Sequence, residues 1–192
     1  MSQLKMFNDD LKPAGVSLKE GFSIINTLNP EYSENDYAEQ WAEICTELNQ
    51  EYDPALYKKF MIDDKNVLRD GIFFVKSPDG TLISTAALRS TAFEDVMGLH
   101  MVATRMNAKG NGAGKAVCAW CVNEAYKKGY RKMHLSTDDF RIPAIKIYVD
   151  LGFMPNLYEA DMRNRWINVA KVIGYQKLPV INENGKHEII SI

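Results

Sequence analysis

The stretch Leu99–Lys115, LHMVATRMNAKGNGAGK, constrains the fold of this chain more than any other. An apolar run that predicts a strand is followed by a short polar connection, and then by Lys-Gly-Asn-Gly-Ala-Gly-Lys, which opens a helix. Glycines at positions 110, 112 and 114 remove every second Cβ, so the backbone can approach a ligand closely. Amide groups at a helix N-terminus favour an anion, so the stretch predicts a phosphate or pyrophosphate site.

The spacing of the glycines disfavours the common nucleotide-binding loops. A Walker loop requires Gly, four residues and Gly-Lys-Ser/Thr, but Lys109 stands at the first glycine position and Ala116 at the hydroxyl position. A dinucleotide-binding G-x-G-x-x-G loop needs its third glycine one residue after Gly114. A turn between a strand and a helix, with no ligand, is the remaining alternative on this stretch alone.

A second pattern follows in the chain. Arg131–Thr137 predicts a strand, and Asp138–Phe153, DDFRIPAIKIYVDLGF, predicts a short helix that closes with Gly-Phe. This helix carries Arg141-x-x-Ala-x-x-x-Tyr148, and the earlier loop carries Lys109-x-x-Gly-x-Gly before its final lysine. The two motifs resemble the acetyl-CoA-binding signatures of the GNAT superfamily of N-acetyltransferases, with Lys for the usual Arg or Gln and Arg for the common Asn. The resemblance covers residues 66–155 well.

The resemblance implies a fold and a ligand. The fold is α/β (α+β), with a mixed, mostly antiparallel central sheet flanked by helices and the glycine loop between a strand and the central helix. Acetyl-CoA is the implied co-substrate, held between two splayed parallel strands, and an unidentified amine is the implied acceptor. The residues expected to bind the coenzyme are Val102, Ala103, Thr104, Lys109, Gly110, Asn111, Gly112, Ala113, Gly114, Lys115, Arg141 and Tyr148.

The same resemblance suggests two catalytic side chains. Tyr148 matches the tyrosine that can protonate the leaving thiolate, and a phenol with a pKa of about 10 keeps its proton at neutral pH. Strand alternation places His100, Val102 and Thr104 on one face, opposite Ala103, and His100 or a water molecule is the expected base for direct attack in a ternary complex. The structural alternatives are a core tyrosine and a hydrogen-bonded histidine.

Two further points stay open from the sequence. Arg141 cannot accept a hydrogen bond as the common Asn does, but it can reach a coenzyme phosphate. A non-catalytic coenzyme-A-binding sensor or scaffold is the alternative function, and it would need neither Tyr148 nor His100.

Composition predicts one ordinary globular domain over residues 1–192, with residues 1–15 and 175–192 loosely ordered or peripheral. The net charge of −2 gives no argument for binding nucleic acid or an anionic membrane. Residues 1–7 do not resemble a signal peptide and no apolar run is long enough to span a membrane, so a cytoplasmic protein is expected. A homodimer is compatible with the sequence.

Cys118 and Cys121 have the spacing of a redox or metal motif, but no second Cys/His pair accompanies them. Both fall on the apolar stripe of the helix after the glycine loop, so packed thiols and no metal are expected.

Turn and periodicity signals predict the remaining elements. Pro78-Asp79-Gly80 predicts a hairpin turn. The other expected elements are a strand within 16–28, a helix capped by Asn35 or Asp36 and reaching Leu48, a helix Pro54–Met61, strands Gly71–Lys76, Thr81–Arg89 and Met97–Thr104, a helix Asp161–Ile173, and an arm or short hairpin over 175–192.

Overall fold

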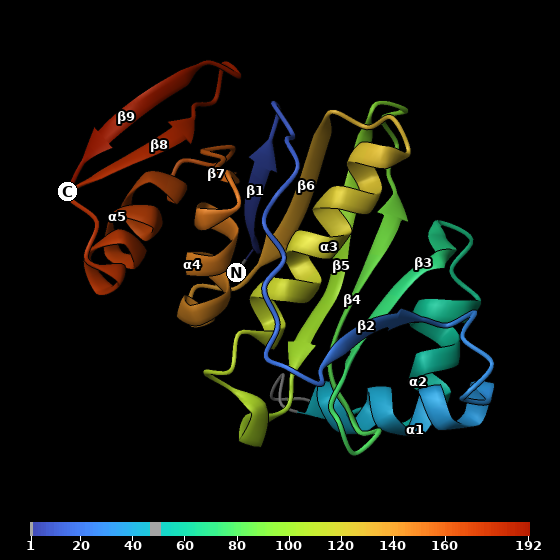
Figure 1. Cartoon of the computed structure of the whole chain (residues 1–192). Coiled ribbons are helices and arrows are strands. Elements are labelled where there is room, and N and C mark those ends of the chain that lie inside the picture. The colour runs from blue at the N-terminus through green and yellow to red at the C-terminus, as the bar shows by residue number, and fades with distance from the viewer. Residues whose placement is uncertain (1, 47–50) are drawn as a thin grey trace. The chain divides into compact units, whose positions relative to one another are not determined.

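The computed structural model describes residues 2–46 and 51–192 and divides the chain into two compact units. Lys12–Arg131 form one of them, the central unit, and Met1–Leu11 with Lys132–Ile192 form the other, the terminal unit. The start of the chain therefore folds with residues 132–192 rather than with the segment that follows it (Figure 1). The expected single domain over 1–192 stays a prediction.

Four strands of the central unit pair antiparallel in the order β2-β3-β4-β5. Their bounds are β2 Ser23–Asn26, β3 Val67–Lys76, β4 Leu82–Ser90 and β5 Val96–Thr104. β3 and β4 meet at the predicted turn, where Gly80 adopts a φ of +88° and donates its N–H to the carbonyl of Ser77 at 3.0 Å. The predicted hairpin and the strand after it are confirmed, and the strand expected within 16–28 is β2.

One face of this sheet carries the helical elements α1 (Glu34–Cys45), α2 (Pro54–Tyr57) and the π-helical turn η2 (Lys58–Ile62). The N-cap of α1 is Ser33, which exchanges hydrogen bonds with Asp36 in a capping box. The prediction that Asn35 or Asp36 caps the helix is wrong, because Asp36 is the reciprocal partner of the true cap. The predicted end at Leu48 lies outside the described residues.

A buried cluster joins these helices to the sheet. Tyr37 of α1 stacks on Phe74 of β3 at 5.3 Å between ring centroids, and Trp41 meets Tyr57 of α2 edge-on at 5.6 Å. Because neighbouring strand residues point to opposite faces, Phe73 lies on the other side, where it contacts Trp120 at 6.4 Å. The central sheet is therefore covered on both faces.

The helix on that second face is α3, Ala113–Lys127. Its thiols, Cys118 and Cys121, are fully buried and free. Burial raises the pKa of Cys118 to about 12, so this thiol stays protonated at neutral pH. The predicted packing of both cysteines is confirmed.

In the terminal unit, β1 (Leu4–Asn8) pairs antiparallel with β6 (Lys132–Thr137) on one side and with β7 (Met154–Pro155) on the other. Leu4 and Met6 are completely buried. The expectation that residues 1–15 are loosely ordered is therefore wrong for Leu4–Asn8. The strand holds because alternate residues of LKMFN face the interior and both of its edges are hydrogen-bonded.

The rest of the terminal unit comprises α4 (Ile142–Asp150), α5 (Met162–Ile173) and the hairpin of β8 (Lys177–Ile181) and β9 (His187–Ser191). The predicted helix before Gly174 is α5, which buries Trp166. Of the two shapes expected for residues 175–192, the short hairpin is the one that forms, with Leu178 and Val180 buried.

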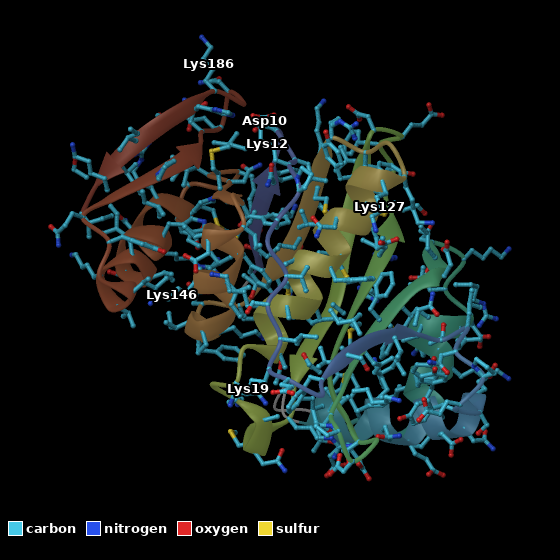
Figure 2. The ribbon with its side chains drawn as sticks, in the orientation of Figure 1. Asp10, Lys12, Lys19, Lys127, Lys146 and Lys186 are labelled. Carbon is cyan, nitrogen blue, oxygen red and sulfur yellow. The ribbon has the colours of Figure 1, made fainter. Side chains whose placement is uncertain are left out.

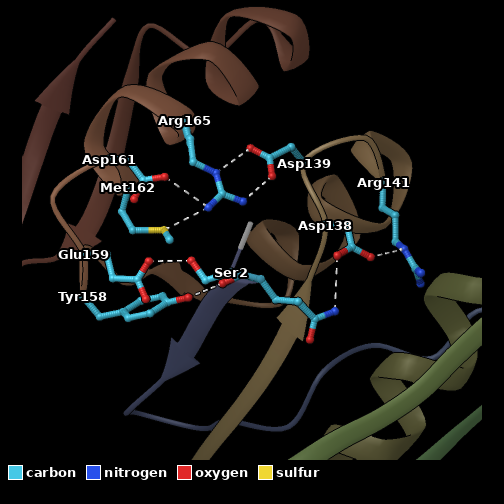
Figure 3. Close-up of polar contacts among 10 residues, drawn as sticks. Ser2, Asp138, Asp139, Arg141, Tyr158, Glu159, Asp161, Met162 and Arg165 are labelled. Carbon is cyan, nitrogen blue, oxygen red and sulfur yellow. Dashed lines mark hydrogen bonds and ion pairs between the residues drawn. The ribbon is translucent and has the colours of Figure 1, made fainter.

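An ion pair ties α5 to the segment before α4 (Figure 3). The Arg165 guanidinium contacts both oxygens of Asp139, with 3.0 Å between Nε and Oδ1. Hydrogen bonds from Arg165 lower the pKa of Asp139, so the pair stays charged at neutral pH.

Candidate active site

The predicted glycine loop lies between β5 and α3 and leaves the helix start uncapped. A short 3₁₀ turn, η3 (Met106–Ala108), leads into it, and Gly110 and Gly112 adopt φ values of +81° and +87°. Gly112 is the N-cap residue of α3, and no side chain caps the helix there. A Cβ on Gly110 would have no atom within 4 Å. The loop is therefore open at Gly110, just before the start of α3, and this arrangement suits an anion.

The side chains of the other loop residues are also compatible with an anion site. Lys109 and Lys115 are exposed, and the Nζ of Lys109 lies 3.0 Å from the sulfur of Met106. The Asn111 side chain accepts a hydrogen bond from the N–H of Ala113 at 3.1 Å, which fixes the last turn before the helix. These residues keep the loop in shape and add positive charge beside it.

A β-bulge interrupts β5 just before the loop. Ala103 pairs with Thr85 and His100 pairs with Ala87, so Met101 and Val102 together oppose a single residue of β4. Met101 adopts a φ of +48°, in the left-handed region that residues with a side chain seldom occupy. The extra residue reverses the alternation of side chains along the strand.

The bulge overturns the predicted placement of His100. Thr85 and Ala87 are two residues apart on β4 and share a face, so their partners Ala103 and His100 share it too. Thr104 is on the opposite face, where its hydroxyl lies 2.8 Å from that of Ser84. The prediction that His100 shares a face with Thr104, opposite Ala103, is wrong.

His100 has one buried ring nitrogen without a partner. Among the residues that the structure describes, nothing hydrogen-bonds its Nε2. Burial lowers the pKa of His100, the charge of Arg89 lowers it further, and a hydrogen bond with the Phe60 backbone and the charge of Asp64 oppose the shift. A hydrogen bond that stabilises the protonated imidazole is one in which a ring N–H is the donor. In the bond with the Phe60 backbone, Nδ1 is therefore the donor, and Nε2 carries the lone pair. His100 is thus a neutral ring with a free acceptor.

The groups around His100 were not evident from the sequence. Arg89 holds the carboxylate of Asp64 with 2.9 Å between Nε and Oδ2, and Phe60 belongs to the π-helical turn η2. π-Helical turns occur frequently at functional sites. Residues 60–64, 89 and 100 come together only through strand pairing and chain folding, so no local pattern could have grouped them.

Tyr148 lies on α4 of the terminal unit and is buried, 5% exposed. Its ring meets Phe153 edge-on at 6.2 Å. The helix closes as predicted, with the Phe153 N–H donating to the Tyr148 carbonyl at 2.9 Å and Gly152 at a φ of +85°. A Cβ on Gly152 would approach the Asn8 side chain to 3.0 Å, so this position favours glycine.

Arg141 is the N-cap residue of α4, in the place of the family's Asn. Its Nε lies 3.0 Å from the carboxylate of Asp138 (Figure 3). Its guanidinium lies 5.5 Å from the ring centroid of Phe140. The side chain makes no cap hydrogen bond, so it does not replace the Asn in that respect. Its predicted contact with a coenzyme phosphate stays a prediction.

The predicted site residues thus form two sets. His100, Val102–Thr104 and Lys109–Lys115 are in the central unit, and Arg141 and Tyr148 are in the terminal unit. Within the described ranges, no three His, Cys, Asp or Glu side chains are grouped so that they could hold a metal ion. No helix in the described part of the chain has the length and apolar character needed to cross a membrane.

The strand β5, the uncapped glycine loop and the helix α3 thus belong to a fold of mixed α and β structure. A family model of the acetyltransferase (GNAT) family matches residues 31–153. The chain therefore belongs to the GNAT family. A search of curated protein sequences finds no match.

Solved structures share this fold. A GCN5-related N-acetyltransferase from Sphaerobacter thermophilus has a TM-score of 0.60 and 17% identity, over 80% of this chain and 48% of that one. An acetyltransferase of the GNAT family from Novosphingobium aromaticivorans has a TM-score of 0.56 and 16% identity, over 80% and 59%. The ribosomal-protein-S18-alanine N-acetyltransferase of Escherichia coli has a TM-score of 0.51 and 18% identity, over 68% and 76%.

These similarities bear on the fold alone. The expected mixed, mostly antiparallel sheet flanked by helices is confirmed. The chain spans about half of the length of the first structures that it matches.

Proposed function

We propose that the chain transfers an acetyl group from acetyl-CoA to an amine. The observation that carries the proposal is the uncapped start of α3 at Gly112, in a chain of the GNAT family. The N–H groups of this turn are placed to bind a pyrophosphate, and the lysines beside them add charge that favours it.

Each site residue then has a proposed role. The backbone of Val102–Thr104 lies along the pantetheine arm, and the loop Lys109–Lys115 holds the pyrophosphate. The neutral amine attacks the thioester carbon, so a C–N bond forms as the C–S bond breaks. His100, directly or through a water molecule, takes the proton from the amine nitrogen. Tyr148 gives its proton to the leaving thiolate.

The free lone pair of His100 favours an enzyme over a coenzyme sensor or scaffold. Acetyl transfer to an amine needs a base, whereas a protein that only binds the coenzyme does not, and the unpartnered Nε2 of His100 is an available acceptor. When His100 acts as the base, the lone pair of this nitrogen accepts the proton of the amine. The buried thiols Cys118 and Cys121 form no disulfide, which suits a reducing compartment and supports a cytoplasmic location.

Thermal denaturation with ligands tests the proposed function. Acetyl-CoA and CoA at about 100 times their Kd stabilise the native state by about 2.7 kcal/mol, which for a chain of this size raises Tm by about 5–10 °C. ATP with magnesium and NAD, at the same concentrations, are expected to leave Tm unchanged. A rise with ATP or NAD and none with CoA would contradict the proposal.

The pH dependence of the reaction tests His100. Since its pKa is lowered, kcat/KM is expected to rise with pH along an acidic limb whose midpoint lies below about 6.5. Arg89→Gln removes the positive charge that disfavours the imidazolium, so the midpoint moves up. Asp64→Asn removes an opposing charge and moves it down. NMR titration of the imidazole measures the same shifts without an acceptor.

His100→Gln supplies the control for this profile. The amide keeps a polar side chain but does not titrate, so the acidic limb should disappear. An unchanged limb in this variant would make His100 structural and leave a water molecule as the base.

A further inference from the structure

Residues 12–22, which lead from β1 to β2, run along α3 to the glycine loop. Asn123 of α3 accepts a hydrogen bond from the Ala14 N–H at 2.7 Å and donates one to the Ala14 carbonyl at 2.9 Å. The Ser17 carbonyl oxygen lies 3.9 Å from the point where a Cβ on Gly112 would stand. Residues 12–22, hereafter the strap, are therefore held against the helix and touch the start of the proposed phosphate site.

The strap carries a lysine at that point. Lys19, labelled in Figure 2, is exposed and stands two residues after Ser17, whose carbonyl oxygen is next to Gly112. Among the described residues, no carboxylate forms an ion pair with Lys19. Lys127 at the far end of α3 differs in this respect, because its ammonium group pairs with Glu124 at 2.7 Å. The strap thus places near the glycine loop a positive charge that no carboxylate among the described residues neutralises.

The position of the strap also makes a positive charge near the glycine loop favourable for binding an anion. A carbonyl oxygen beside an anion is unfavourable, and Ser17 places one next to Gly112. An ammonium group two residues further along offsets that repulsion, because charge-assisted hydrogen bonds to phosphate are strong.

We propose that the strap is part of the coenzyme site and that the ammonium group of Lys19 binds a phosphate of the coenzyme. The inference rests on the proposed function. The phosphate is either the pyrophosphate on the loop or the 3′-phosphate of the ribose, and the two ligands CoA and 3′-dephospho-CoA separate these sources.

Calorimetric titration of both ligands tests the inference. Lys19→Ala is expected to weaken CoA binding by about 3–10-fold, and Lys19→Glu by more, because a repulsion replaces an attraction. Equal losses for both ligands assign Lys19 to the pyrophosphate, and a loss for CoA alone assigns it to the 3′-phosphate. Lys127→Ala is the matched control and should bind both ligands as the wild type does.

A second measurement needs no variant. Acetylation of lysines by an N-hydroxysuccinimide ester, followed by mass spectrometry, should show Lys19 protected by CoA and Lys127 unprotected. Wild-type affinity of Lys19→Glu for both ligands, with no protection of Lys19, overturns the inference and leaves the proposed function intact. A wild-type protein that binds neither ligand overturns both.

Discussion

Tyr148→Phe is expected to lower kcat by about 10²–10⁴-fold while the Kd for acetyl-CoA stays within a few-fold. The substitution keeps the ring, its contact with Phe153 and the packing of α4, and it removes only the hydroxyl that would protonate the thiolate. Single-turnover measurements with an acceptor found by an amine screen, read by thiol release, isolate the chemical step. Equilibrium titration measures the Kd for acetyl-CoA independently, so the effects on catalysis and on coenzyme binding are separated.

Tyr158→Phe is the matched control in the same unit. Tyr158 (Figure 3) is none of the proposed site residues, and its hydroxyl donates to the Gln3 carbonyl, so the variant loses one tyrosine hydrogen bond and keeps the ring. This variant should turn over at the wild-type rate. If Tyr148→Phe does so as well, with chemistry limiting, Tyr148 is a core residue and the acid must be sought elsewhere.

The fold was predictable where local signals agree with tertiary packing. Pro78-Asp79-Gly80 determines its turn through fixed and positive φ values, and the glycine loop is set by residues next to one another. The helix α5 was predicted from the spacing of its apolar residues, and its buried residues follow that spacing. In each case the information lies within a dozen neighbouring residues.

Other features depend on distant residues. LKMFN alternates as a strand does, but five residues cannot indicate that β6 and β7 will pair with it. The bulge at Met101 could not be predicted from the sequence either, because a register shift depends on the partner strand. One extra residue moved His100 to the other face and gave it neighbours, Arg89 and Asp64, that no spacing rule connects to it.

Gly112→Val is expected to weaken CoA binding by about 10²–10⁴-fold, which at ordinary concentrations reads as no binding. The estimate corresponds to losing two hydrogen bonds to a charged group at about 1.5–3 kcal/mol each. A Cβ at this position makes only an ordinary contact with Ser17, at 3.9 Å, so the protein has room to fold. The branched side chain, however, would occupy the approach to the amides and resist the φ of +87°.

Gly129→Val distinguishes the phosphate site from backbone strain. Gly129 follows the other end of α3 with a φ of +95°, and a Cβ there meets no atom within 4 Å. Both variants should lose a similar amount of stability, about 1–2 kcal/mol for a side chain in the left-handed region. Only Gly112→Val should lose coenzyme binding in calorimetric titration. If Gly112→Val folds and binds CoA as the wild type does, the pyrophosphate is held elsewhere and the proposed roles of Lys109–Lys115 fall with it.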